Sequence, residues 1–176
     1  SGTPCNSFTS ARRHDGGPIP LRDQANPRGF AWLTGKDRDD ARTGNYLADV
    51  TAELARMVFI ANGHFTIENP ESSWIWRLLV FRELAAFVAA TWAVVSRCVY
   101  GLQGDDHGGL AVKRTAIMAT HPAFKTIWLE CPGESKTHWH VVLRGRKWSD
   151  EKGKWVYRTD GSSGYTRPFC ETFART

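Results

Sequence analysis

Residues 2–8 read Gly-Thr-Pro-Cys-Asn-Ser-Phe, a short polar loop in which proline precedes a single cysteine, Cys5. A second polar loop, residues 67–70 (Ile-Glu-Asn-Pro), ends an apolar run further along the chain. In sheets of parallel strands, the loops that follow the strands gather at one edge of the sheet. We therefore expect the thiol of Cys5 and the carboxylate of Glu68 to meet at such an edge, as a nucleophile and an acid.

Helical and extended patterns alternate along the rest of the chain. Apolar residues at three- and four-residue steps predict a helix from about residue 43 to residue 61, with an apolar stripe that includes Leu54 and Met57. Further helices are expected over residues 73–90 and from about residue 166. Apolar runs predict strands at residues 64–67, 92–100, 112–120, 126–130 and 138–143. This alternation favours an α/β fold with a largely parallel sheet flanked by helices.

The composition is that of one globular α/β domain over residues 1–176. Hydrophobic residues make up 41% and charged residues 23% of the chain, and the net charge is +5. This mild excess of positive charge is compatible with a polyanionic partner. The longest apolar run, residues 84–95, is too short to span a bilayer, so no membrane partner is expected. Residues 9–43 are predicted to be a long polar loop, and residues 144–163 a basic, Trp-rich loop or hairpin.

Four cysteines stand at positions 5, 98, 131 and 170, and none of them forms a Cys-x-x-Cys pair. With wide spacing and no visible secretory signal, they favour a reducing, intracellular setting, nuclear or cytoplasmic. Since the chain begins at Ser1 rather than at Met, we expect it to be a fragment of a larger protein.

Each of the two polar loops also has a simpler interpretation. A thiolate close to a helix N-terminus is a good nucleophile, but a lone cysteine such as Cys5 is more often an inert loop residue. A partly desolvated Glu68 can hold a proton near neutral pH, whereas Glu68, Asn69 and Pro70 together could merely cap the helix that follows.

In combination the motifs are more informative. Pro4-Cys5, preceded by Gly-Thr, resembles the Pro-Cys loop of the C5-cytosine DNA methyltransferase family, and residues 68–70 resemble its Glu-Asn-Val motif. Tyr100-Gly101, followed by Lys113-Arg114-Thr115 and an apolar run, resembles its later Tyr-Gly turn and Gln-x-Arg-x-Arg motif. The order of the motifs matches over residues 2–120.

The chain also departs from the family's pattern. Asn6 stands in place of the usual Gln, and Pro70 in place of Val. The interval from Cys5 to Glu68 is longer than in the family, and the family's glycine-rich cofactor loop, which precedes the Pro-Cys pair, has no counterpart here. The resemblance is thus to part of a catalytic domain, one that is incomplete or inactive as it stands.

The resemblance implies a methyltransferase-like (Rossmann-type) fold that acts on a cytosine flipped out of DNA. Cys5 would attack carbon 6 of the base and Glu68 would protonate nitrogen 3, after which carbon 5 takes a methyl group from S-adenosylmethionine. Asn69 would hold the neighbouring loop, and Arg114 would contact the base and its phosphate. Further DNA contacts would come from Arg12, Arg13 and Lys113.

A third cluster has metal-ligating residue types. Cys131, His138 and His140 could supply three zinc ligands, with Cys98 or Cys170 as a fourth. On a strand the two histidines point to the same face, so the geometry is feasible. The alternative is an exposed polar face beside a loop cysteine.

The basic stretch after residue 144 includes Arg146 and Lys147 and is interleaved with Trp148, Trp155 and Tyr157. Cations with aromatic rings suit nucleic acids, through phosphate contacts and base stacking. A solvated hairpin with cross-strand Trp contacts is the alternative. Two further functions thus remain open beside the methyltransferase: a non-catalytic nucleic-acid-binding module, such as one from a mobile element, and a zinc-stabilised domain.

Overall fold

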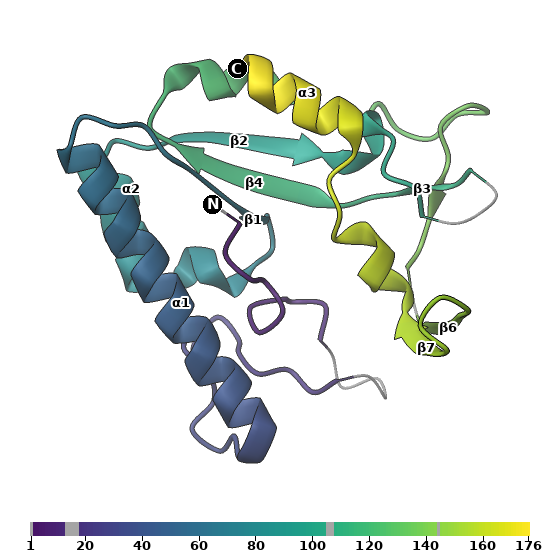
Figure 1. Cartoon of the computed structure of the whole chain (residues 1–176), viewed down its shortest axis with the longest axis horizontal. Helices are drawn as coiled ribbons and strands as arrows, with labels where there is room; N and C mark the ends of the chain where they lie inside the picture. The colour runs from purple at the N-terminus through teal and green to yellow at the C-terminus, as the bar shows by residue number, and fades with distance from the viewer. Residues whose placement is uncertain (1, 13–17, 105–107, 144) are drawn as a thin grey trace. The chain divides into compact units, whose positions relative to one another are not determined.

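The computed structural model describes residues 2–12, 18–104, 108–143 and 145–176 (Figure 1). The chain divides into two compact units. Unit 1 consists of Ser1–Ala93 and Thr115–Lys125, and unit 2 of Val94–Arg114 and Thr126–Thr176. No helix in the described ranges is long and apolar enough to cross a membrane.

The largest sheet has three strands in the order β1-β4-β2. These strands are β1 (Thr66–Pro70), β4 (Arg114–Ala119) and β2 (Thr91–Ser96). β1 runs antiparallel to β4, with Thr66 opposite Ala119 and Pro70 opposite Thr115. The boundaries between the two units fall within β2 and β4.

The prediction of a largely parallel, Rossmann-type sheet is therefore wrong. The hairpin of β6 (Arg146–Ser149) and β7 (Lys154–Tyr157) is also antiparallel. Among the described residues, the one parallel sheet is the pair of β3 (Leu110–Ala111) with β5 (His140–Val141). Parallel strands need a crossover connection, usually a helix. The described residues of the connection from β2 to β4 form instead a short turn of 3-10 helix, η2 (Arg97–Tyr100), and β3.

The long helix α1 (Gly35–Ile60) begins eight residues before the predicted start at residue 43. Its buried face is a stripe of small residues: Ala41, Gly44, Ala48, Ala52 and Ala55. The predicted stripe of larger side chains lies elsewhere on the helix, and both Leu54 and Met57 are 56% exposed. Small residues on the buried face allow the backbone of α1 to come close to its neighbours.

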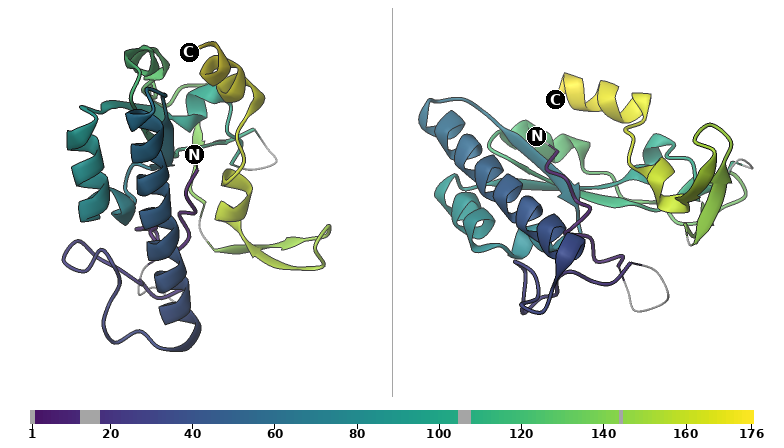
Figure 2. Two further views of the ribbon diagram at one scale, coloured as in Figure 1. Left: turned by 60° about the vertical axis from the view of Figure 1, so that its left-hand side comes forward. Right: turned by 60° about the horizontal axis from the view of Figure 1, so that its bottom comes forward.

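The core of unit 1 lies among α1, α2 (Leu79–Phe87) and β1. The two helices lie side by side (Figures 1 and 2). Between these elements a continuous cluster of buried side chains joins the N-terminal loop to the sheet: Phe8, Ala48, Ala52, Ala55, Ile67, Ile75, Leu78, Phe81, Leu84, Val88 and Met118.

Other element boundaries also differ from the sequence prediction. The second predicted helix is divided into η1 (Trp74–Arg77) and α2, because Leu78 between them has an extended backbone (φ −62°, ψ 134°). In place of the strand expected over residues 126–130, η3 (Pro122–Ile127) covers the first two of these residues, and Leu129 forms a single parallel bridge with Val95. The predicted last helix is present as α3 (Arg167–Arg175), with proline in its first turn.

Unit 2 has short elements around a small core. Apart from its strands it contains η2, η4 (Arg158–Ser162) and α3. Arg97 is fully buried there, with its guanidinium 4.7 Å from the ring centroid of Tyr165 and 5.0 Å from that of Phe169. Its Nη2 donates to the carbonyl of Gly164 at 2.6 Å. A core of this size is easily destabilised, so an additional cross-link would add substantially to the stability of such a unit.

Replacing Gly44 by Ala tests the close approach of α1. Helix propensity alone predicts that Ala stabilises a helix interior by about 1 kcal/mol relative to Gly. At this position, however, the added Cβ would overlap the hydroxyl oxygen of Ser7 and lie 3.2 Å from the ring of Phe8. We expect the steric cost to dominate, so that urea denaturation shows a free energy of unfolding lowered by about 1–3 kcal/mol.

Gly161→Ala is the matched control, because nothing lies within 4 Å of the Cβ it would add. It should change the stability by less than about 0.5 kcal/mol. A Gly44→Ala variant as stable as the parent protein, or more stable, would contradict the close packing of α1.

Candidate functional sites

The loop that carries Cys5 is a tight turn, and its C-terminal end is anchored in the core of unit 1. The N–H of Phe8 donates to the carbonyl of Cys5 at 2.9 Å, which closes the turn. The carbonyl of Phe8 in turn accepts from the N–H of Trp74 at 2.9 Å, and the Phe8 ring is fully buried in the core. Cys5 itself is half-buried and its thiol is free.

A buried arginine, Arg22, connects this loop to α1. Its Nε and Nη2 donate to the carbonyl and the hydroxyl of Ser7, at 2.9 and 3.2 Å. Nη2 also donates to the carbonyl of Ala41 at 2.7 Å, and Nη1 donates to the carbonyl of Pro27 and to Oδ1 of Asn45, at 2.8 and 2.6 Å. The guanidinium group lies 3.9 Å from the ring centroid of Phe8.

Burial, together with the nearby charges of Arg28 and Arg12, lowers the pKa of Arg22 to about 10. The guanidinium nevertheless stays charged at neutral pH. Its hydrogen-bond partners in unit 1 are backbone carbonyls and neutral side-chain oxygens.

The loop of Cys5 and the Glu-Asn segment lie next to each other. Gly2 forms a parallel β-bridge with Glu68, and Nδ2 of Asn69 donates to the carbonyl of Thr3 at 2.7 Å. Asn69 is completely buried. Because side chains alternate along a strand, the half-buried Glu68 lies on the face of β1 opposite to Ile67 and Asn69. The structure thus brings together the backbones of the two segments that the sequence singled out.

The other residues proposed for DNA contact belong to both units. Arg12 is largely buried and lies 3.8 Å from Asp37 in unit 1, and Arg13 lies outside the described residues. Lys113 and Arg114 belong to unit 2, where Nζ of Lys113 donates to the carbonyl of Ser162 at 3.1 Å. For S-adenosylmethionine, the described part of the chain supports no site.

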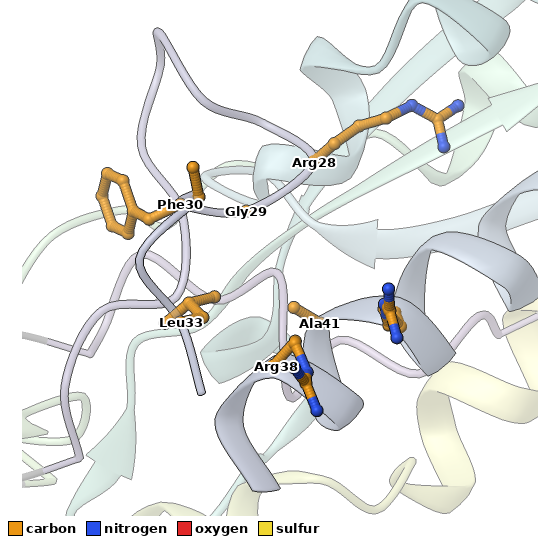
Figure 3. A pocket seen from close by; sticks show the side chains of 8 residues that line it. Arg28, Gly29, Phe30, Leu33, Arg38 and Ala41 are labelled. Atoms are coloured by element: carbon orange, nitrogen blue, oxygen red, sulfur yellow. The ribbon is translucent and has the colours of Figure 1, made fainter. Parts of the chain in front are cut away.

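A pocket of about 230 Å³ lies where the 28–33 segment meets the start of α1 (Figure 3). Three arginines are among its lining residues, Arg28, Arg38 and Arg42. The guanidinium groups of Arg28 and Arg38 point in different directions (Figure 3). Arg28 forms two hydrogen bonds with the carboxylate of Asp49, at 2.7 and 3.0 Å. The arginines therefore do not converge on one anion, and the pocket contains none of the site residues predicted from the sequence.

The predicted metal ligands do converge, within unit 2. Sγ of Cys131 lies 3.4 Å from Nε2 of His138 and 3.4 Å from Nε2 of His140, and the two Nε2 atoms are 3.0 Å apart. Cys98 completes the group, and all four ligand atoms lie within 4.8 Å of one another. This Cys/His cluster can hold a metal ion.

These distances agree with a single tetrahedral ion. With Zn–S of about 2.3 Å and Zn–N of about 2.0–2.1 Å, tetrahedral geometry places two nitrogen ligands about 3.3 Å apart and a sulfur and a nitrogen about 3.6 Å apart. The separations among the ligand atoms of Cys131, His138 and His140 are shorter than these by only a few tenths of an ångström, and with Cys98 the group extends to at most 4.8 Å.

The local structure explains how the ligands are positioned. Cys98 lies in η2, in the stretch that the sequence predicted as strand, and it is 99% buried. His140 begins β5, and a turn with hydrogen bonds between Ser135 and His138 brings the second histidine back to it. The sequence left Cys98 and Cys170 as alternatives for the fourth ligand. Cys170 is exposed on α3 and is not part of the cluster.

Groups outside the cluster support the ligands. The N–H of Gly133 donates to Sγ of Cys131 at 3.4 Å. Oε1 of Glu134 accepts from the backbone N–H of His140 at 3.2 Å and lies 3.6 Å from its Nδ1. A carboxylate beside the other ring nitrogen is the usual partner of a metal-binding histidine. Burial, and then the neighbouring Cys131, raise the pKa of Cys98 to about 11, so a metal would have to displace its proton.

No family model, curated protein or solved structure matches the chain. The chemistry of the protein is therefore inferred from the arrangement of its own residues.

Removing the side-chain amide of Asn69 tests whether it holds the loop of Cys5 in place. Asn69→Ala leaves the carbonyl of Thr3 without this donor, which costs about 1–3 kcal/mol for a buried group. We expect a lower melting temperature and faster alkylation of Cys5, followed by mass spectrometry of the labelled peptides. Asn26→Ala, at an exposed residue that bonds within its own loop, is the control and should change neither quantity. Unaltered alkylation of Cys5 in Asn69→Ala would show that the contact does not position the loop.

Proposed function

We propose that the chain is a zinc-binding protein in which one zinc ion stabilises unit 2. The observation that carries this proposal is the position of four ligand atoms, from Cys98, Cys131, His138 and His140, within 4.8 Å of one another. Two cysteines and two histidines form a closed donor set that is typical of structural zinc rather than of a catalytic site with an open position. The softer thiolate ligands also favour zinc over magnesium or calcium, which prefer oxygen.

The ion would connect two parts of the chain that are distant in sequence. Cys98 lies in one segment of unit 2 and the other three ligands lie in the other segment. Because the core of this unit is small, we expect the free energy of metal binding to contribute directly to its folding.

Metal analysis of the purified protein tests this proposal. We expect one zinc per chain and a lower melting temperature after chelation. Cys98→Ser and Cys131→Ser should each lower the zinc affinity more than 100-fold, because each removes a ligand. Glu134→Gln should lower it by about 10- to 100-fold, the usual effect of losing an outer partner.

Cys170→Ser is the matched control, since it removes an exposed thiol outside the cluster. It should leave both the zinc content and the melting temperature unchanged. A protein that is fully folded without metal, and that takes up no zinc when zinc is supplied, would exclude the proposal.

A second function is favoured by one observation in unit 1, the adjacency of the Cys5 loop and the Glu-Asn segment through the Gly2–Glu68 bridge and the Asn69–Thr3 hydrogen bond. We infer that Cys5 and Glu68 act on cytosine in DNA, in keeping with the resemblance to C5-cytosine DNA methyltransferases. The thiolate of Cys5 would add to carbon 6 while Glu68 gives a proton to nitrogen 3. Carbon 5 would then take a proton from solvent and lose its original hydrogen as the thiolate leaves.

This exchange restores cytosine and requires no methyl donor, so the chain can be tested as it stands. We expect it to release tritium from DNA labelled at carbon 5 of cytosine. Cys5→Ala should abolish the release, and Glu68→Gln should slow it by about 10²- to 10⁴-fold, the usual contribution of a general acid.

Cys170→Ser should release tritium at the parental rate. If the zinc-loaded protein releases none, or if release is the same in Cys5→Ala, then the cytosine chemistry is excluded. The zinc proposal is decided separately, by metal content.

A further inference from the structure

The hairpin of β6 and β7 in unit 2 presents its aromatic side chains on one face. Trp148 lies directly opposite Trp155, and Arg146 lies opposite Tyr157. Residues opposite each other in an antiparallel pair share a face, as do residues two apart along a strand. The four side chains therefore form one continuous surface, here called the aromatic face of the hairpin. The two strands form an extended ribbon in both views of Figure 2.

The aromatic face is open to solvent. Trp148 is 51% exposed and Trp155 is 62% exposed, with their rings edge to face at a centroid distance of 6.1 Å. The guanidinium of Arg146 lies 4.7 Å from the ring centroid of Tyr157, and Nη2 donates to its hydroxyl at 2.7 Å. These two pairs hold the strands together, since a two-stranded hairpin is marginally stable in water. They do so while leaving large aromatic surface uncovered.

The charges of the hairpin are distributed unevenly. Lys147 and Lys154 lie on the face opposite the tryptophans and are exposed. The turn between the strands carries two acidic residues, Asp150 and Glu151, followed by Lys152. The ribbon is thus cationic along its strands and partly acidic at its tip.

We propose that this hairpin binds single-stranded nucleic acid, with unpaired bases stacked on Trp148 and Trp155, with a phosphate held by Arg146 on the same face, and with the phosphate backbone attracted by Lys147 and Lys154 on the opposite face of the ribbon. Aromatic rings that are open to solvent offer a stacking surface to every base, and the cations of the two faces of the ribbon attract the phosphate backbone. This inference goes beyond the zinc ion and the cytosine chemistry, and it uses none of their residues.

The other partners that exposed tryptophans attract fit less well. A hairpin enters a membrane interface tip first, and Asp150 and Glu151 at this tip would be repelled by anionic lipid. A double helix keeps its bases stacked upon each other, so the flat faces of Trp148 and Trp155 would gain little from it. An unpaired strand is the partner that uses both the rings and the cations.

Binding of a fluorescein-labelled, 20-nucleotide pyrimidine-rich strand tests the proposal, measured by anisotropy with the whole 176-residue chain loaded with zinc. We expect salt-dependent binding accompanied by quenching of Trp fluorescence. The double substitution Trp148→Ala/Trp155→Ala should weaken binding at least tenfold, because each stacked base contributes about 1–3 kcal/mol. Lys147→Gln/Lys154→Gln should keep the quenching and reduce the slope of log affinity against log salt by about 1.4, at about 0.7 per phosphate contact.

Two further variants separate stacking from folding of the hairpin. Trp148→Tyr/Trp155→Tyr keeps aromatic rings on this face and should retain more of the affinity than the alanine pair. Trp32→Ala removes an exposed Trp of unit 1 and should leave binding unchanged. The proposal is overturned if the strand does not bind at low salt, if duplex of the same sequence binds as tightly, or if the protein binds vesicles of anionic lipid and not the strand.

Discussion

The arrangement of unit 1 depends on one buried cation. Among the described residues, the hydrogen-bond acceptors of Arg22 include no carboxylate, and five oxygens of the backbone and of neutral side chains surround its charge. Desolvating a charge is costly, and this arrangement is stable only when all of those oxygens are in place. The loop of Cys5 and the first turns of α1 supply several of them and are therefore fixed together. The same crowding explains why position 44 has no side chain.

The sequence predicted the adjacency of two segments of unit 1 better than the architecture of its sheet. Cys5 and Glu68 were singled out as reactive residue types in two polar loops, and the two segments do lie side by side. The predicted direction of the strands was wrong, because alternating helices and strands indicate a parallel sheet only where a crossover connects consecutive strands. The local sequence pattern around β4 does not show that β4 follows β2 without a crossover connection. The bridge between Gly2 and Glu68 depends on contacts across more than sixty residues, which no short pattern contains.

Two other features were inaccessible to pattern analysis for different reasons. The buried face of α1 consists of alanine and glycine, which score weakly as apolar, so the larger and exposed Leu54 and Met57 dominated the periodicity. In unit 2 the sequence identified Cys131, His138 and His140 by residue type and spacing. The fourth ligand could not be chosen between Cys98 and Cys170, because that choice depends on how η2 and α3 pack. The one signal in the sequence that could have favoured Cys98 is its position in a strongly apolar segment, which predicts that the cysteine is buried.

The interleaving of the two units along the chain has a consequence for biosynthesis. The ribosome releases Cys98 well before Cys131 and His140, and at about 5–20 residues per second the delay is roughly 2–8 s. During that interval the thiol of Cys98 lacks the other ligands of the cluster. Unit 1 also remains incomplete until the residues of β4 have emerged. Neither unit can be completed from its first segment alone: unit 1 stays incomplete until Lys125 has emerged, and unit 2 until its second segment, which begins at Thr126, has been translated.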